Sequence, residues 1–571
     1  MTAFIIHNMA PIMFASLIVL LLLGYPVAFA LATCGLGFGI LGIELGLFHP
    51  AFLQALPERI FGIMSNDTLL AIPFFTFMGL ILERSGMAED LLDTVGQLFG
   101  PIRGGLAYAV ILVGALLAAT TGVVAASVIA MGLISLPIML RYGYDRRVAS
   151  GVIAASGTLA QIIPPSLVLI IMADQLGRSV GDMYTGAFIP GFVLTGLYMA
   201  YVFIMTLVYP NAAPALPVEA RTLGRGVMSL FVCLGMSVAL GYVAVTQSGA
   251  ATNVGIWIAT ASIGISYAIA VFNRMLGLGL LSRLAQQVII VLMPPLALIF
   301  LVLGTIFVGI ATPTEGGAMG AAGALLLALA KRQLSFTLLR QALDATTKLS
   351  AFVLFILVGA RVFSLTFYGV NGHKWVEDLL LGLPGGQLGF LIVVNIIVFV
   401  LAFFLDFFEL SFIVVPLLAP VAEKLGIDLI WFGVLLGVNL QTSFMHPPFG
   451  FALFYLRSVA PRVPFLDKVT GKSTQPVTTA QIYWGAVPFV FIQVLMIGLT
   501  IAFPQMVMHY KGSGPVVDPS SIQITLPPAG GFEPPNFGPA TPNFGVPGDK
   551  APGGTGPGNP PLDLSQPPRF N

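Results

Sequence analysis

The chain has 571 residues, of which 57% are apolar and only 9% charged, whereas soluble proteins carry about 25% charged residues. So few charges cannot cover the surface of a soluble protein of this length, and a formal net charge of +1 gives no electrostatic reason to expect a nucleic-acid partner. Two cysteines, Cys34 and Cys233, are too few for a disulfide or metal framework. The composition therefore excludes soluble enzymes and secreted scaffolds, and it predicts an all-α polytopic membrane protein.

Apolar stretches that can cross a membrane follow one another along the chain, because about 20 apolar residues span the hydrocarbon layer as a helix. The expected crossings are residues 4–23, 26–46, 68–83, 148–173, 183–208, 227–247, 251–272, 286–311, 314–330, 349–369, 429–456 and 481–507. The first run passes through Gly24-Tyr25-Pro26 directly into the next, so we expect no cleavable signal peptide. Most basic residues lie on one side if the N-terminus is outside, so the positive-inside rule predicts an external N-terminus and an external C-terminal tail, both periplasmic if the host is a Gram-negative bacterium.

Two further apolar stretches are interrupted near their middle, at 118–122 and at 405–409. We interpret them as re-entrant hairpins, residues 103–141 and 387–424, whose turns stop inside the membrane. The alternative is two full crossings in each stretch, since limbs of about 17 residues are at the lower limit for spanning. Both readings return the chain to the side from which it entered.

The chain contains an internal repeat, because structure-breaking residues coincide at an offset of 283 positions. The matching pairs are Pro137 and Pro420, Gly143 and Gly426, Asp145 and Asp428, Pro164 and Pro447, and Pro165 and Pro448. We predict one repeat at 1–210 and another at 285–507, joined by a linker at 211–284 that holds two extra helices. Each repeat has five crossings and one hairpin, and an odd number of crossings makes the second copy inverted, as in secondary transporters. Residues 508–571 are rich in proline and glycine and should form a disordered tail.

Each repeat contains a span, 148–173 or 429–456, that is interrupted by a Pro-Pro pair after a polar run. Proline removes a backbone donor and frees carbonyl groups, which need partners in a membrane. Freed carbonyls beside hydroxyl and amide oxygens suit Na⁺ as a coupling ion, and opposed helix ends suit an anionic substrate. The alternative is a simple kink whose neighbouring hydroxyls bond back to the helix.

Four polar residues within apolar stretches have more than one possible role each. Asp406 is costly in a membrane and is either a cation ligand or the N-cap of the second hairpin limb. Glu315 fits a capping box, Thr312-Pro313-Thr314-Glu315, better than a chemical role. Arg361 either snorkels or pairs with a carboxylate, or else meets an anionic substrate. His446 either protonates or is hydrogen-bonded at the helix break.

Four motifs, in the order of the family, resemble the large membrane subunit of tripartite ATP-independent periplasmic (TRAP) transporters. They lie at 121–127, at 154–166, at 309–315 and at 404–406, and the similarity covers about residues 10–210 and 285–507. The resemblance implies the ion transporter superfamily fold, with a scaffold and a mobile transport domain. It also implies an elevator mechanism driven by a Na⁺ gradient in a bacterial inner membrane. Its implied partners are a small four-helix membrane subunit and a periplasmic solute-binding protein that delivers a carboxylate.

The resemblance also implies which residues bind the ion and the substrate. The Na⁺ candidates carried over from the family are Thr120, Thr121, Gly122, Ser156, Gly157, Thr158, Asp406, Asn439, Gln441, Thr442 and Ser443. The substrate candidates are Pro164, Pro165, Ser166, Arg361, His446 and Pro447. His446 stands where the family more often has threonine, and the helices at 227–272 look like an insertion.

Competing functions remain open at this point. A stand-alone Na⁺- or H⁺-coupled anion symporter of the same superfamily would share the repeat. A membrane scaffold or an intramembrane enzyme would leave the duplicated Pro-Pro breaks unexplained, and the sequence has neither a catalytic dyad at one depth nor a phosphate-binding loop, since residues 466–473 lack its first glycine. We therefore expect a transporter subunit that is not an enzyme.

Overall fold

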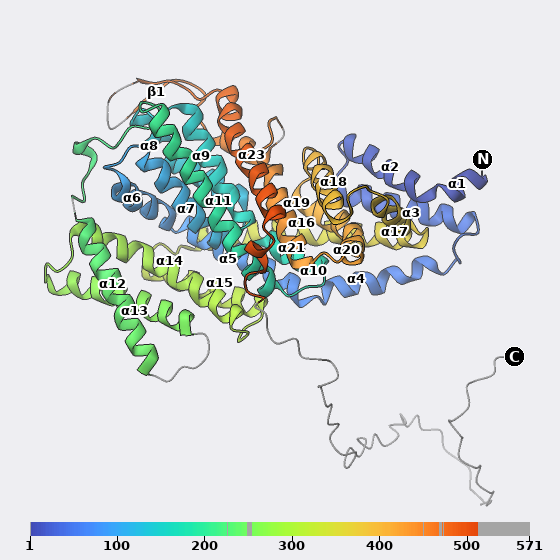
Figure 1. Cartoon of the computed structure of the whole chain (residues 1–571), viewed down its shortest axis with the longest axis horizontal. Helices are drawn as coiled ribbons and strands as arrows, with labels where there is room; N and C mark the ends of the chain where they lie inside the picture. The colour runs from blue at the N-terminus through green and yellow to red at the C-terminus, as the bar shows by residue number, and fades with distance from the viewer. Residues whose placement is uncertain are drawn as a thin grey trace, which may run out of the picture. The chain divides into compact units, whose positions relative to one another are not determined.

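The structure, a computed structural model, describes residues 2–224, 226–247, 254–448, 450–467, 471 and 473–511. The chain divides into a unit at 1–512 and a unit at 513–571, and the predicted tail beyond residue 511 lies outside the described residues. The first unit is almost entirely helical (Figure 1). Its only described strands are β1 (Phe465–Leu466) and β2 (Ser473–Thr474), which pair antiparallel.

Helices account for the first half of the described chain. Their bounds are α1 (Thr2–His7), α2 (Met9–Leu22), α3 (Val27–Glu44), η1 (Phe52–Ala55), α4 (Leu56–Met64), η2 (Asp67–Leu70), α5 (Ala71–Arg84), α6 (Met87–Phe99), α7 (Gly105–Thr121), α8 (Val124–Arg141), α9 (Arg146–Thr158), η3 (Leu159–Gln161), α10 (Leu167–Gln175), α11 (Val180–Val208), η4 (Val218–Ala220), α12 (Val227–Gln247) and α13 (Val254–Leu276).

The second half is built in the same way. Its elements are α14 (Arg283–Phe307), α15 (Pro313–Ala330), α16 (Phe336–Gly369), α17 (Gly372–Leu381), α18 (Gly386–Leu401), α19 (Phe407–Ile413), α20 (Val415–Lys424), α21 (Leu429–Leu440), η5 (Gln441–Phe444), α22 (Phe451–Val459), α23 (Thr479–Ala502) and α24 (Gln505–Met508).

Many of these helices can cross a membrane. Among the described residues, eight are long and apolar enough, or ten if each of two bent helix pairs is one crossing. The prediction of a helical, multi-pass membrane protein is therefore confirmed, and the short β1–β2 pair is the one described departure from an all-α architecture.

Sequence reasoning missed helices that are amphipathic rather than apolar throughout. In α6, Leu91, Leu92 and Val95 are buried while Glu89 is exposed, so a search for continuous apolar runs passes over it. The same holds for α4 and α17, which have one apolar face each. The expected crossing at 349–369 is the second part of α16, which begins at Phe336 and has 34 residues.

Both interrupted stretches form helical hairpins that are closed at the base by a hydrogen bond. The Leu106 amide donates to the Tyr144 hydroxyl over 3.1 Å, and the Gln387 side chain donates to the Leu425 carbonyl over 2.5 Å. In both pairs the partners are 38 residues apart. The first hairpin turns at Gly122, whose φ of +58° favours glycine.

Both Pro-Pro spans are broken helices with matching ends. Asp145 caps α9 by accepting from the amides of residues 147 and 148, and Asp428 caps α21 through residues 430 and 431. A 3₁₀ turn, η3 or η5, follows each helix, and the chain then loses helical form before α10 or α22 begins. Both Pro-Pro bonds are cis.

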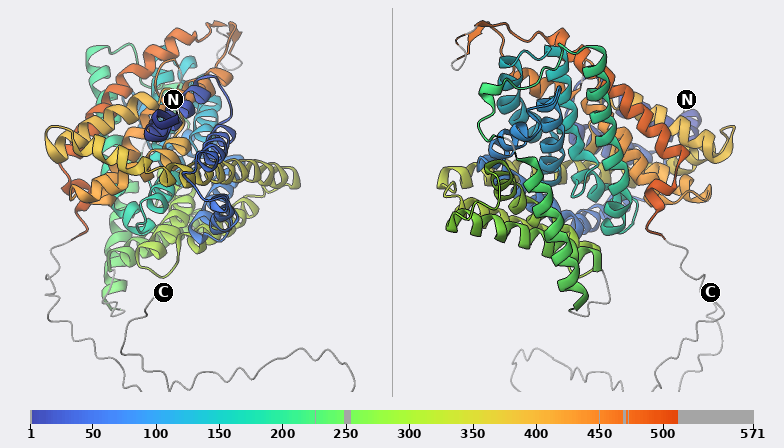
Figure 2. Two further views of the ribbon diagram at one scale, coloured as in Figure 1. Left: turned by 90° about the vertical axis from the view of Figure 1, so that its right-hand side faces the viewer. Right: turned by 60° about the vertical axis from the view of Figure 1, so that its left-hand side comes forward.

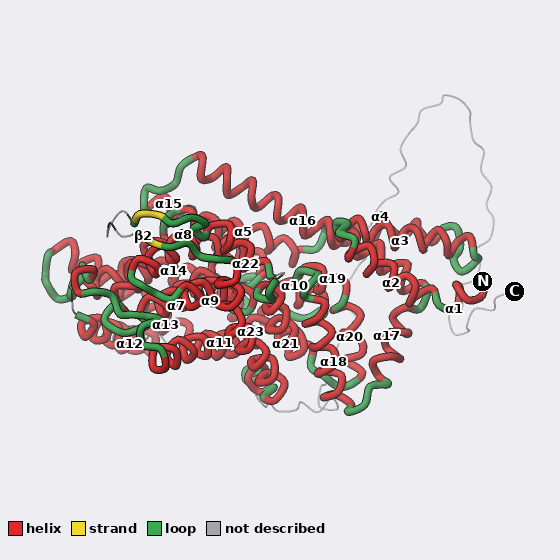
Figure 3. The backbone as a smooth tube through the Cα atoms, turned by 90° about the horizontal axis from the view of Figure 1, so that it is seen from above, coloured by secondary structure: helices red, strands yellow, loops and turns green. Residues whose placement is uncertain are grey.

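The broken helices lie in the core of the first unit. All described residues from 148 to 158 in α9 are buried, and α9 packs against α7, α8 and α23. A Cβ atom at Gly151 would lie 2.1 Å from the Gly485 carbonyl oxygen, so α9 and α23 touch through their backbones. Figures 2 and 3 show α12 and α13, the two extra helices expected in the linker, beside α14 and away from α2 and α3.

Candidate functional site

The turns of both hairpins meet at one cavity of about 340 Å³. It brings together the predicted residues Gly122 and Asp406, which are far apart in the sequence. Its other walls come from the first helix break, from α16 and from the region around the second break. The lining residues are Gly122, Val123, Val124, Ala125, Gln161, Leu167, Leu349, Phe352, Phe404, Asp406, Phe407, Phe408, Glu409, Phe444, Phe451 and Tyr455.

The first hairpin turn lies directly against the first Pro-Pro break. A Cβ atom at Gly122 would be 3.4 Å from the Pro165 carbonyl oxygen and 3.2 Å from Leu167 Cγ. Glycine therefore permits both the left-handed turn and the close approach. The side chains of the predicted ligands Thr120 and Thr121 lie outside the described residues, although α7 ends at Thr121.

Two carboxylates lie at the start of α19 and form a capping box. Asp406 Oδ1 accepts from the Glu409 amide over 3.1 Å, and Glu409 Oε2 accepts from the Asp406 amide over 3.0 Å. Both residues also line the cavity, and Glu409 is only 9% exposed. The N-cap role of Asp406 is thus observed, as is the capping box of Glu315 on α15, while the cation-ligand role stays a prediction.

The predicted hydroxyl ligands in both breaks bond back to their own helices. Ser156 and Thr158 donate to the carbonyls of Ile153 and Ala155, and residues 442 and 443 do the same with the carbonyls of residues 439 and 440. This is the alternative that the sequence left open for a simple kink. A hydroxyl that donates its proton keeps acceptor lone pairs, so each oxygen can still face a cation.

Four buried amide oxygens at or beside the breaks have no hydrogen-bond partner among the described residues: Gln161 Oε1, Asn439 Oδ1, Gln441 Oε1 and Gln493 Oε1. Their residues are at most 1% exposed. A buried acceptor without a partner costs about 1–3 kcal/mol, and a cation or a bound water would remove that cost. Oxygen atoms are also the donors that Na⁺ takes in broken-helix transporters, so the chemistry of these groups fits the ion, and Gln161 places one of them at the cavity.

The contacts between hairpin and broken helix correspond in the two predicted repeats. Asn439 Nδ2 donates to the Asn395 carbonyl and side-chain oxygens over 2.8 and 2.9 Å, which joins α21 to α18. In the first repeat α7 meets α9 at Gly114, where a Cβ atom would be 2.5 Å from Ser156 Cβ. At the neighbouring Gly157 a Cβ atom would be 2.3 Å from a side-chain carbon of Val128 on α8, so this candidate packs the helices together.

The two broken helices are also joined to each other. Gln441 Nε2 donates to Thr158 Oγ1 over 3.1 Å, and these residues are 283 positions apart, the offset of the sequence repeat. Tyr198 on α11 and Gln493 on α23 complete the cluster, with Gln493 Nε2 donating to the Tyr198 hydroxyl over 3.0 Å. Sequence reasoning missed both; a glutamine inside the apolar run of α23 was the available signal.

The predicted substrate-binding residues do not line the cavity between the hairpin turns. Ser166 caps α10 and donates to the Gln161 carbonyl over 2.5 Å, while Pro164, Pro165 and Pro447 form the breaks without lining the cavity. Arg361 lies on an exposed part of α16 and does not line it either.

The hydrogen-bonded histidine expected at the second break is not observed. His446 is buried, and neither ring nitrogen has a partner among the described residues. Its ring instead stacks on Phe403 and meets the edge of Phe399, with centroids 4.2 and 4.3 Å away. The His446 ring therefore packs against aromatic side chains of α18 and of the residues that follow it, and it makes no hydrogen bond to any described residue there.

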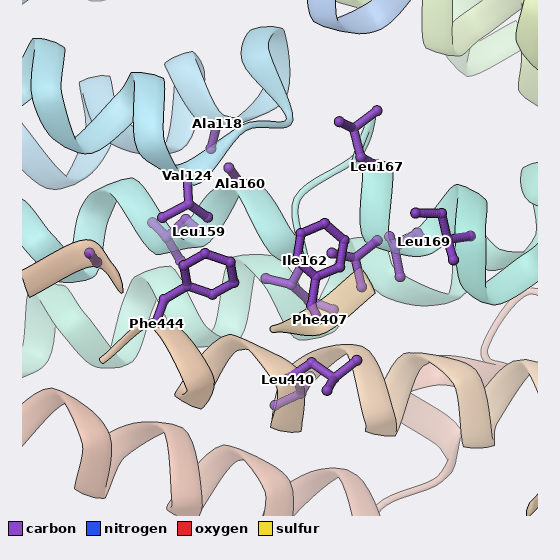
Figure 4. Close-up of a cluster of buried hydrophobic side chains, with 14 of the residues drawn as sticks. Ala118, Val124, Leu159, Ala160, Ile162, Leu167, Leu169, Phe407, Leu440 and Phe444 are labelled. Atoms are coloured by element: carbon purple, nitrogen blue, oxygen red, sulfur yellow. The ribbon is translucent and has the colours of Figure 1, made fainter. Parts of the chain in front are cut away.

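The region between the two breaks is otherwise apolar. Figure 4 shows Phe407 and Phe444 beside Leu159, Ala160 and Ile162. Lysine, arginine and histidine are missing from the lining residues, whereas two carboxylates are present. This composition favours a cation over an isolated anion in the cavity.

Comparison with known proteins agrees with this architecture. The family model described as "Tripartite ATP-independent periplasmic transporter, DctM component" matches residues 14–281 and 227–506. The C4-dicarboxylate TRAP transporter large permease protein DctM of Pseudomonas aeruginosa is 29% identical over 418 residues, 72% of this chain and 82% of the relative. The 2,3-diketo-L-gulonate TRAP transporter large permease protein YiaN of Escherichia coli is 26% identical over 476 residues, 83% of this chain and 95% of the relative.

Among solved structures, the YdaH transporter of Alcanivorax borkumensis has 13% identity and a TM-score of 0.47, covering 81% of this chain and 91% of its own. The family match extends over more than half of the chain and includes both broken helices. Together with the apolar helices, it makes the protein a multi-pass transporter subunit and not an enzyme. The chain belongs to the DctM family, the large permease component of tripartite ATP-independent periplasmic transporters.

Proposed function

We propose that this subunit imports a small carboxylate by Na⁺-coupled secondary transport, through an elevator movement of the domain that carries both hairpins. The observation that carries the proposal is the cavity between the hairpin turns. It places the carboxylates of Asp406 and Glu409 beside the partnerless oxygen of Gln161. When bound, Na⁺ would supply the positive charge that this cavity lacks, held by Asp406 and by oxygens of the breaks.

Correspondences between the two predicted repeats support the transport part of the proposal. The hairpins have closing bonds of equal sequence spacing, and the broken helices begin with the same aspartate cap. Thr158 and Gln441, which are equivalent at the repeat offset, contact each other. Equivalent residues of two copies can contact each other only close to the two-fold axis that relates the copies. In transporters with inverted repeats, that axis lies in the membrane plane and the binding site is near the bilayer midplane.

The charge of the cavity explains why transport should depend strictly on the cation. A carboxylate that enters alone faces Asp406 and Glu409 in a poorly hydrated site, where like charges repel strongly. Bound Na⁺ offsets that repulsion, so substrate binding becomes conditional on ion binding. This conditional binding is the coupling that a secondary transporter needs to use an ion gradient.

The named relatives support small organic acids as the substrate class, since their names specify a C4-dicarboxylate and 2,3-diketo-L-gulonate. The family description supports a three-part system. We therefore propose a small four-helix membrane subunit and a periplasmic solute-binding protein as partners. We also propose a bacterial inner-membrane location with both termini periplasmic.

Reconstitution tests the coupling. Proteoliposomes with the chain and its partner subunits would be given a radiolabelled dicarboxylate under an inward Na⁺ gradient, a proton gradient or neither. We expect uptake with the Na⁺ gradient alone. Equal uptake in all three conditions would refute secondary transport. Full Na⁺-driven uptake without the binding protein would instead favour a stand-alone symporter.

Asp406→Asn separates the two roles of that residue. Asparagine is as good an N-cap as aspartate, so α19 should form, while the cavity loses one negative charge. We expect the Na⁺ concentration for half-maximal uptake to rise roughly tenfold, which is about 1.4 kcal/mol. The matched control is Asp428→Asn, at an N-cap outside the cavity, and it should leave this concentration unchanged. Identical behaviour of the two variants would contradict the ion-ligand role.

A further inference from the structure

A second cavity, of about 800 Å³, opens where α9 and α23 begin and α11 ends. Figure 1 shows these helices reaching the end of the unit that carries β1. The lining residues that carry the inference are Arg146, Arg147, Tyr201, Tyr209, Asn211 and Trp484. None of them belongs to the cavity between the hairpin turns.

The walls of this second cavity are held in place by backbone contacts. The Gly151–Gly485 approach fixes α9 against α23. The Asp145 amide donates to the Ala212 carbonyl over 2.8 Å, which ties the chain after α11 to the start of α9. The cavity is therefore preformed and not a gap between independent segments.

Two arginines in this cavity lack an acidic partner. Within the described ranges, Arg146 and Arg147 form no ion pair, whereas Arg141 pairs with Asp467 at 2.8 Å. Arg146 Nε is buried and has no acceptor among those residues. The carboxylate of Asp145 also lines the cavity, but its Oδ1 accepts from the amides of residues 147 and 148. A buried guanidinium nitrogen without an acceptor is costly, so the cavity suits an external anion.

The aromatic side chains indicate where that anion comes from. Tyr209 and Trp484 are 62% and 63% exposed, and tyrosine and tryptophan are enriched at the level of lipid headgroups. Guanidinium groups match phosphate geometry, and basic pockets between membrane helices bind anionic headgroups. We propose that this cavity binds the phosphate headgroup of an anionic phospholipid, such as phosphatidylglycerol or cardiolipin, from the adjoining leaflet.

Native mass spectrometry of the purified full chain tests the proposal, using equal amounts of phosphatidylglycerol and phosphatidylcholine. We expect a preference for phosphatidylglycerol that falls roughly 20- to 30-fold in the Arg146→Gln/Arg147→Gln variant, at about 1 kcal/mol for each arginine. The control, Arg283→Gln, removes an exposed arginine outside the cavity and should keep the preference. An unchanged preference in the double variant would refute the site.

A second measurement does not depend on folding of the double variant. Brominated phosphatidylglycerol should quench the tryptophan fluorescence of the wild-type chain more than brominated phosphatidylcholine does, and Trp484→Phe should remove the difference. No difference between the two lipids would overturn the proposal. Displacement of phosphatidylglycerol by millimolar inorganic phosphate would overturn the lipid source and indicate a site for free phosphate.

Discussion

The hydrogen-bonded cluster that joins the two broken helices to α11 and α23 predicts which pairs of side chains are energetically coupled. Thr158 accepts from Gln441 over 3.1 Å but from Gln493 over 3.5 Å. Tyr198 accepts from Gln493 over 3.0 Å but from Gln441 over 3.5 Å. Since hydrogen bonds weaken beyond about 3.2 Å, each hydroxyl should couple to a different glutamine.

The expected magnitudes follow from buried hydrogen bonds, each of which contributes about 0.5–1.5 kcal/mol net. We expect coupling energies near 1 kcal/mol for Thr158→Val with Gln441→Met and for Tyr198→Phe with Gln493→Met. The two exchanged combinations should couple by no more than about 0.3 kcal/mol, which is the usual limit of additivity.

Double-mutant cycles measured by SDS-induced unfolding in mixed micelles would provide these energies. The control pairs Thr195→Val with Gln441→Met, because the Thr195 hydroxyl donates to the Gly191 carbonyl one turn away. That pair should be additive. Equal couplings in all four test combinations, or larger couplings in the exchanged ones, would refute the arrangement of the cluster.

Three further predictions concern glycines and one ion pair. Gly151→Ala should abolish the folded peak in size-exclusion chromatography, because its Cβ atom would be 2.1 Å from a carbonyl oxygen of α23, while Gly196→Ala, with nothing within 4 Å, should fold. Gly122→Ala should lower the unfolding free energy by about 1–2 kcal/mol, since φ is +58°. Burial raises the pKa of Asp428, but hydrogen bonds from Lys511 and from backbone amides outweigh it and leave the pKa lowered. This stabilisation is present above the unfolded pKa of about 3.9 and is lost as pH falls through the lower folded value. The melting temperature, measured between pH 7 and 3, should therefore fall at the acid end, and the fall should be smaller in Lys511→Gln.

Strong local signals made much of the fold predictable. Continuous apolar runs identified the long helices, and proline pairs at a constant offset located both breaks. The amphipathic helices α4, α6 and α17 contain no continuous apolar run, because polar residues alternate with apolar ones at helical spacing, so only a periodic signal could have found them. The hydrogen bonds of buried polar side chains could not be predicted from the sequence either. Whether Thr158 bonds back to Ala155 or contacts Gln441 depends on how two helices far apart in the sequence pack together. In the structure, Thr158 does both.

The capping box on α19 constrains how the cavity can work. Asp406 and Glu409 each accept a hydrogen bond from the other's backbone amide, and a helix N-terminus favours negative charge. The first turn of α19 therefore keeps two carboxylates at the cavity even though positively charged side chains are missing from its described lining. In the mechanism we propose, a carboxylate substrate meets this negative charge first, so a cation has to bind before it or together with it. The capping box that begins α19 would then also set the order in which ion and substrate bind.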